Sequence, residues 1–115
     1  MRLVLALIQP TKLKAVQEAL AKIGVERMTV CDGLGYGQQR GGRGEGSPAA
    51  KPTLLRKVTL EIGVNEDFLD KTVETIALVA RTGGSGAIGD GKIFVLPIDD
   101  VVRLSDCVRG PEGIS

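Results

Sequence analysis

A chain of 115 residues is the length of one small domain, and its three aromatic residues predict a core built from Leu, Ile and Val. Fifteen basic and 14 acidic residues leave a net charge of +1, which argues against the uniformly basic surface of a nucleic-acid-binding protein. Histidine is absent and the two cysteines, Cys31 and Cys107, lie far apart in sequence, so we predict neither a metal site nor a catalytic residue.

The first half of the chain predicts a strand, a helix and a second strand. The apolar run 3–8 is expected to be a buried strand; it is too short to span a membrane and has no signal-peptide cleavage pattern, so we expect a cytoplasmic protein with reduced thiols. Thr11 is the expected N-cap of a helix that ends at Gly24. Residues 25–32 are expected to form the next strand. The helix is indicated by apolar residues three and four positions apart, namely Leu13, Val16, Leu20 and Ile23.

The second half repeats this order. Residues 57–64 alternate between apolar and polar, which predicts a half-buried strand, and Asn65 is the expected N-cap of a second helix. A last strand is expected at 93–96, before Pro97. Two strand–helix–strand units in so short a chain predict an α+β, ferredoxin-like split βαβ fold (βαββαβ) with a four-stranded antiparallel sheet and two helices on one face. The apolar stripe of the second helix consists of Leu69, Val73, Ile76 and Ala80.

One face of such a sheet has no helices to cover it. Residues 3–8 and 93–96 are apolar at consecutive positions, so the uncovered face also carries apolar side chains. Burial of that face against other copies of the chain is therefore expected.

Residues 33–56 predict a long loop between the two halves. The segment is rich in glycine and basic residues, and it cannot bury enough apolar surface to offset the entropy of ordering it. We expect it to be mobile when free and to bind a partner or an effector, while an inert, solvated excursion is the alternative.

Residues 82–95, TGGSGAIGDGKIFV, have a composition that suits a backbone cradle for phosphate. Glycines permit positive φ and close approach to an anion, and Lys92 adds a positive charge where the loop ends. The segment is not a Walker A loop, because it runs from helix to strand and Ile93 follows the lysine. A flexible glycine-rich connection is the alternative.

Four segments together resemble the PII (P-II) signal-transduction family: GYGQQRGG at 35–42, KVTLEI at 57–62, TG…IGDGKIFV at 82–95 and VVRL at 101–104. The resemblance implies a single domain, 1–115, that forms a homotrimer and binds adenine nucleotides in the clefts between subunits. It implies a sensor rather than an enzyme, whose long loop at about 36–56 docks onto a protein target such as a transporter or a metabolic enzyme. Residues 82–92 would hold the nucleotide and the tail, 104–115, would form a third wall of the cleft.

The resemblance also implies site residues. ADP, AMP or ATP is the implied ligand, with Mg²⁺ possible alongside ATP. Gln39 and Lys57 match positions that hold magnesium and 2-oxoglutarate, so a small anion such as 2-oxoglutarate or bicarbonate is the implied effector. Gln38 and Ser105 stand where the family usually has arginines, which favours ADP or AMP. The implied nucleotide-binding residues are Thr29, Gly35, Gly37, Gln38, Gln39, Glu61, Thr82, Gly89, Asp90, Gly91, Lys92 and Arg103.

Two other functions remain open from the residues alone. A small ATP-hydrolysing or phosphoryl-transfer enzyme would use the glycine-rich loop and Asp90, although no second acidic residue stands beside Asp90. A nucleic-acid binder would use the basic glycine-rich loop around Arg43. The only tyrosine, Tyr36, is expected at the base of the long loop, and Ser47 is the hydroxyl nearest its tip.

Overall fold

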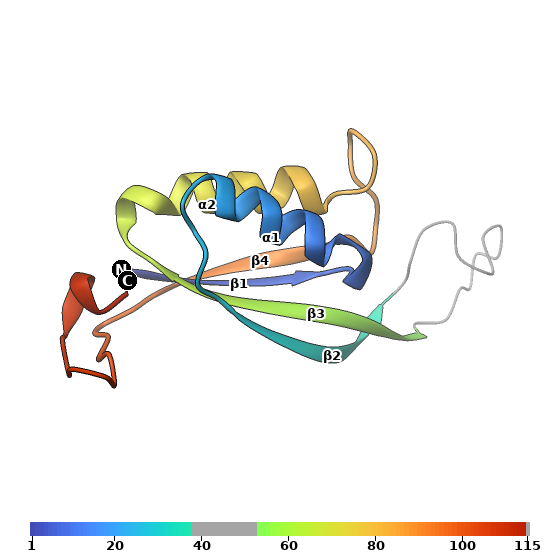
Figure 1. Ribbon diagram of the computed structural model, residues 1–115. Helices are drawn as coiled ribbons and strands as arrows, with labels where there is room; N and C mark the ends of the chain where they lie inside the picture. Colours follow the sequence, from blue (N-terminus) through green and yellow to red (C-terminus); the bar gives the residue numbers. More distant parts are fainter. Residues whose placement is uncertain (38–52, 115) are drawn as a thin grey trace, which may run out of the picture.

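The computed structural model describes residues 1–37 and 53–114, and over these ranges the ferredoxin-like prediction is confirmed. Figure 1 shows both helices on one side of a four-stranded sheet. The strand order is β2-β3-β1-β4 and every neighbouring pair is antiparallel. The elements are β1 (Arg2–Ile8), α1 (Leu13–Lys22), β2 (Thr29–Gly37), β3 (Thr53–Val64), α2 (Glu66–Ala80) and β4 (Gly91–Pro97), with 3₁₀ helices η1 (Pro10–Lys12) and η2 (Gly110–Ile114).

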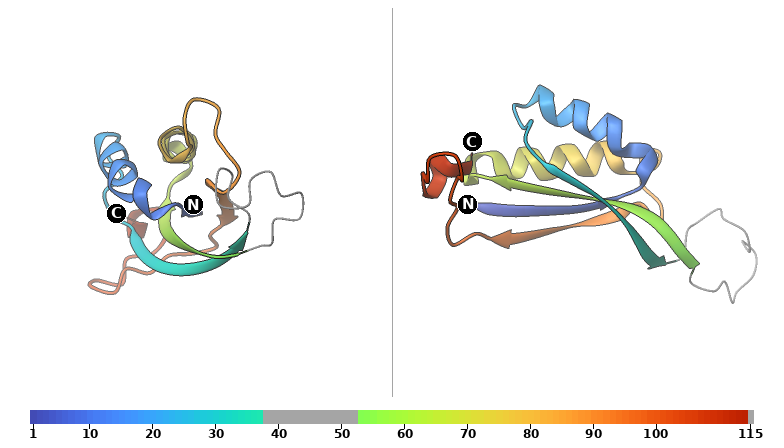
Figure 2. Two further views of the ribbon diagram at one scale, coloured as in Figure 1. Left: turned by 90° about the vertical axis from the view of Figure 1, so that its right-hand side faces the viewer. Right: turned by 60° about the horizontal axis from the view of Figure 1, so that its bottom comes forward.

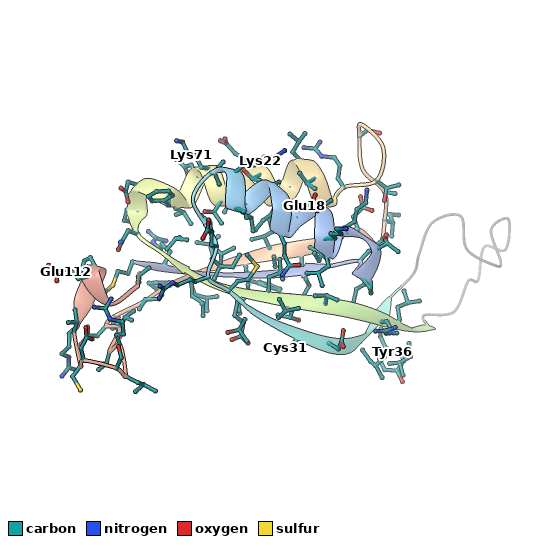
Figure 3. All side chains as sticks on the ribbon, viewed as in Figure 1. Glu18, Lys22, Cys31, Tyr36, Lys71 and Glu112 are labelled. Carbon is teal, nitrogen blue, oxygen red and sulfur yellow. The ribbon has the colours of Figure 1, made fainter. Side chains whose placement is uncertain are left out.

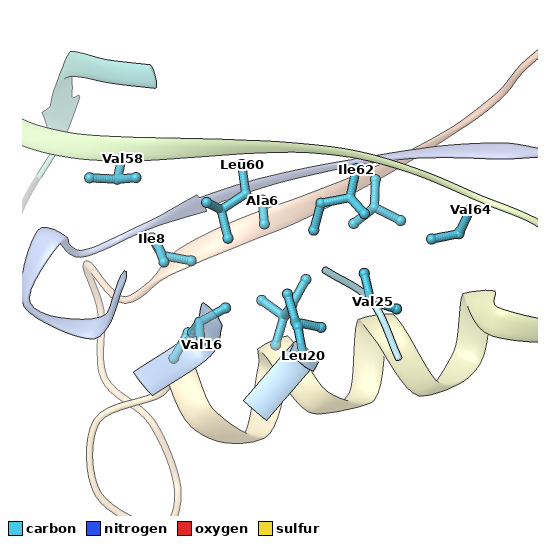
Figure 4. Packing of buried hydrophobic residues seen from close by; sticks show 12 residues of the cluster. Ala6, Ile8, Val16, Leu20, Val25, Val58, Leu60, Ile62 and Val64 are labelled. Carbon is cyan, nitrogen blue, oxygen red and sulfur yellow. The ribbon is translucent and has the colours of Figure 1, made fainter. Parts of the chain in front are cut away.

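The core lies between the helices and one face of the sheet (Figure 4). Alternate residues of β1 and β3 point into it, and the pairing of Ala6 with Leu60 sets the register that keeps both apolar rows on this side. Leu20 of α1 and Ile76 of α2 fill the space opposite and are fully buried. Burial of these aliphatic side chains is the main force that holds the helices on the sheet.

The other face of the sheet, here called the open face, also carries apolar side chains. Leu5 of β1 pairs with Phe94 of β4, and Leu3 pairs with Leu96. Phe94 and Leu96 are 48% and 40% exposed in the single chain. The two-sided apolar character expected of β1 and β4 is therefore present, and it leaves an apolar surface that no element within residues 1–37 and 53–114 covers.

Strand β2 is shifted from its predicted position at 25–32, since residues 25–28 are not strand and β2 begins at Thr29 and runs on to Gly37. Strand β3 begins at Thr53, before its predicted start at residue 57. Residues 33–37 pair with residues 53–57, from Gly33 opposite Lys57 to Gly37 opposite Thr53. This two-stranded arm projects beyond the helices (Figures 1 and 2). The expectation that 33–56 is all loop was wrong at both ends. At 33–37, pairing with the adjacent strand overrides the weak strand propensity of glycine, and residues 53–56 extend β3 as its partner. The interior of the expected loop, 38–52, lies outside the described residues.

Helix ends differ in detail from the prediction. Thr11 is not a helix N-cap, since it lies inside η1 and α1 begins one residue after Lys12. Gly24 ends α1 as expected, with φ of 90°, and the N–H of Val25 donates to the carbonyl of Leu20 (2.9 Å). Asn65 is the N-cap of α2, but its side chain instead donates to the carbonyl of Pro111 (3.3 Å).

The stripe of α2 also contains a polar residue. Thr72 is fully buried and its hydroxyl donates to the carbonyl of Phe68 (2.7 Å), which satisfies the group inside the helix. Ile76 and Ala80 are buried as predicted, while Leu69 and Val73 are partly buried against the core.

Candidate functional site

The glycine loop, residues 82–92, is closed by the carboxylate of Asp90. One carboxylate oxygen accepts the backbone N–H groups of Thr82 (2.9 Å) and Ala87 (2.8 Å), and the other accepts the hydroxyl of Thr82. These hydrogen bonds, chiefly the one from the Thr82 hydroxyl, lower the pKa of Asp90. Thr82 and Asp90, both predicted site residues, therefore fix the conformation of the loop through hydrogen bonds inside it.

Glycine is required where the loop meets β4. Gly91 has φ of 118°, and a Cβ atom there would lie 1.8 Å from the carbonyl oxygen of Leu7. Gly89 has φ of 98°. At Gly91 the loop backbone therefore lies directly against the end of β1. Both glycines have positive φ angles, which residues with side chains rarely adopt.

Two polar side chains hold the loop from the sheet side. The Nζ atom of Lys57 donates to the carbonyl of Gly89, and Nε2 of Gln9 donates to the same oxygen (3.2 Å). Lys57 lies on β3, where the arm begins, so it connects the arm to the glycine loop. Gln9 was not predicted as a site residue, although its position directly after a buried strand is a signal for it.

The open face carries the next group of predicted residues. Lys92 pairs with Leu7 and is exposed, and Thr29 and Glu61 are cross-strand partners that are also exposed. Since alternate residues of a strand point to opposite faces, Lys92 and Glu61 share the face of Leu7 and Leu5. These side chains can meet a ligand only on the side of the sheet away from the helices.

The remaining predicted residues lie on the arm or outside the described ranges. Gly35 pairs with Leu55, and a Cβ atom added there would lie 3.6 Å from Cγ of Lys57. Gly37 pairs with Thr53, the last described pair of the arm. Gln38 and Gln39 lie outside the described residues. Figure 3 places Tyr36 on the arm and Cys31 on the sheet side away from the helices.

The C-terminal segment that contains Arg103 lies at the other end of the molecule from the glycine loop (Figures 1 and 2). This segment, residues 98–114, starts beside the N-terminus, where the N–H of Ile98 donates to the carbonyl of Met1 (3.1 Å). The guanidinium of Arg103 binds both carboxylate oxygens of Asp106, at 3.0 and 2.8 Å, and the carbonyl of Glu112 at 3.1 Å. Asp106 was not predicted, and its place three residues after Arg103 gives no motif by which to find it.

A surface cavity of about 260 Å³ lies beneath the glycine loop. Its lining is mostly apolar and comes from the end of α2, the end of β1 and the start of β4. The charged residues of the lining are Arg81, Asp90 and Lys92. The apolar part of the lining does not suit a phosphate group, so the loop backbone and Lys92 are the expected places for an anion. Within residues 1–37 and 53–114, no group of three His, Cys, Asp or Glu side chains is arranged to hold a metal ion.

Known proteins with similar sequences identify the family of this chain. The family model described as nitrogen regulatory protein P-II matches residues 1–107. The chain belongs to the P-II family. The nitrogen regulatory protein GlnK1 of Methanosarcina mazei is 44% identical over 116 residues, which cover 99% of this chain and 97% of the relative. The nitrogen regulatory protein P-II of Rhizobium etli is 44% identical over 106 residues, covering 90% and 91%.

A solved P-II structure has the same fold. The crystal structure of Arabidopsis thaliana PII bound to citrate superposes with a TM-score of 0.76 at 34% identity, covering 98% of this chain and 88% of that one. The matching family model and both relatives are named as nitrogen regulatory proteins. No helix in the described part of this P-II chain is long and apolar enough to cross a membrane.

Proposed function

We propose that the chain is a trimeric signal-transduction regulator that binds an adenine nucleotide in each cleft between subunits and controls a protein target through residues 36–56. It acts by binding rather than by chemistry. The observation that carries this proposal is the form of the glycine loop, which Asp90 closes and which Gly91 presses onto β1 beside Lys92. A fixed glycine backbone next to a lysine suits phosphate oxygens.

The separation of Arg103 from the glycine loop supports a cleft made by two subunits. The two cationic residues expected to hold phosphate are far apart in one subunit. Lys92 pairs with Leu7 near the end of β1, whereas Arg103 belongs to the segment that starts beside Met1. The open face offers apolar surface for assembly, with Phe94 and Leu96 partly exposed. A neighbouring subunit packed there supplies the second cation, so each ligand contacts two chains.

Few cations are available for the outer phosphate of ATP. The family resemblance implies arginines where this chain has Gln38 and Ser105. Each charged hydrogen bond to phosphate is worth about 1.5–3 kcal/mol. We therefore expect ADP or AMP to bind at least as tightly as ATP. Calorimetric titrations at one magnesium and salt concentration measure this, and a dissociation constant for ATP more than about tenfold below that of ADP would contradict it.

Lys57 is the expected contact of a small anionic effector. The Arabidopsis relative was solved with citrate, a carboxylate anion, bound. Lys57 contacts the glycine loop through the carbonyl of Gly89, so an anion that draws Lys57 away also loosens that loop. 2-Oxoglutarate and bicarbonate are the candidates, with Gln39 and Lys57 as the expected contacts.

The test of the nucleotide site is the substitution Lys92→Ala. It should weaken ADP binding by about 1.5–3 kcal/mol, the value of a hydrogen bond to a charged group, without unfolding the protein. Lys71→Ala is the matched control, because it removes the same charge from the exposed surface of α2 (Figure 3). Equal affinities for the two variants would place the ligand elsewhere. Release of phosphate from ATP by the wild-type protein alone would favour the enzyme alternative.

A further inference from the structure

The carboxylate of Asp106 occupies one complete edge of the Arg103 guanidinium. Nε donates to one carboxylate oxygen (3.0 Å) and Nη2 donates to the other (2.8 Å). This paired arrangement is the same one through which arginine binds a phosphate group. One guanidinium edge cannot serve Asp106 and a phosphate at the same time.

The local backbone presents Asp106 to Arg103. The N–H of Cys107 donates to the carbonyl of Arg103 (2.7 Å), and the N–H of Arg103 donates to the carbonyl of Val108 (2.9 Å). Cys107 has φ of 59°, which turns the chain sharply between these bonds. Asp106 also accepts the N–H of Val108 (3.2 Å), so its position is fixed by the turn as well as by the arginine.

We propose that Asp106 competes with the nucleotide's phosphate for Arg103 and so lowers the nucleotide affinity of this chain. The inference rests on the proposed nucleotide-binding function. Arg103 lowers the pKa of Asp106, which keeps the carboxylate charged at neutral pH and able to compete. The pair is partly exposed, with side chains 32% and 46% accessible, so a phosphate can reach and displace the carboxylate at modest cost.

The test is calorimetric titration of ADP and of adenosine into Asp106→Asn. The amide still accepts the N–H of Val108 but has no charge to hold Arg103. ADP affinity should rise about two- to fivefold, the range that exposed ion pairs support, and adenosine affinity should not change because adenosine has no phosphate. Asp100→Asn is the matched control, since it loses a similar pair with Arg109 (2.8 Å) in the same segment but leaves Arg103 untouched.

A double variant separates competition for Arg103 from a change in folding. In an Arg103→Ala background, Asp106→Asn should have no effect on ADP affinity. Weaker ADP binding by Asp106→Asn would show that Asp106 positions Arg103 for phosphate, and an equal gain in Asp100→Asn would show a general charge effect; either overturns the inference. ADP binding that is the same in wild type and Asp106→Asn overturns this inference alone, whereas the absence of ADP binding in wild type overturns the proposed function too.

Discussion

The stability of the glycine loop should depend on pH through Asp90. Its pKa is lowered in the folded chain, so its stabilising contribution is fully present above the ordinary value of 3.8 and is lost as the pH falls through the lower folded-state value. The N–H groups of Thr82 and Ala87 report on this directly, because both donate to Asp90.

We predict that the amide resonances of Thr82 and Ala87 shift together in an NMR titration, with a midpoint below 3.8. Asp90→Asn should remove this transition while leaving the core folded. A midpoint at or above the ordinary value would show that the carboxylate does not close the loop in solution.

Residues whose role follows from local backbone conformation could be predicted from the sequence. Residues whose role depends on one contact made in the folded chain could not. The glycines of the loop and Lys92 stand out in the sequence, because their spacing has a direct conformational meaning. Gln9 and Asp106 do not stand out, since each matters through a partner whose position depends on the folded backbone. The diversion of Asn65 to Pro111 was hidden for the same reason.

Among elements, the order and type of the α-helices and strands followed from apolar runs and periodicity, whereas the 3₁₀ helices η1 and η2 were not predicted. The alternation in residues 57–64 and the three-four spacing in α1 each match a face that the structure buries. The bounds of β2 and β3 did not follow, because the arm is stabilised by cross-strand hydrogen bonds rather than by its own apolar pattern.

The junction of the glycine loop with β1 should be the least tolerant point of the loop. Gly91→Ala places a Cβ atom against the carbonyl of Leu7 at an unfavourable φ, so we predict a loss of at least about 2 kcal/mol in the free energy of unfolding. Gly84→Ala is the control, since nothing lies within 4 Å of its Cβ position. Urea denaturation measures both, and equal stabilities would show that the backbone contact relaxes freely.

The whole molecule is expected to assemble through the open face. Phe94→Asp places a charge at a position that is 48% exposed in the single chain and is buried in the proposed trimer. We predict that light scattering shows a trimer for the wild type and smaller species for this variant. Leu78→Asp is the control, because Leu78 is 69% exposed on α2 and lies away from the open face. A wild-type monomer at micromolar concentration contradicts the assembly.

The central claim is that one ligand contacts the glycine loop of one subunit and Arg103 of another. Subunits carrying Lys92→Ala and subunits carrying Arg103→Ala, refolded together in equal amounts, test it by calorimetry with ADP. In random trimers about a quarter of the clefts combine the intact Lys92 of one subunit with the intact Arg103 of its neighbour, so about a quarter of the sites should regain wild-type affinity. If every site in the mixture stays as weak as in the separate variants, the two residues do not meet across a subunit boundary and the account is wrong.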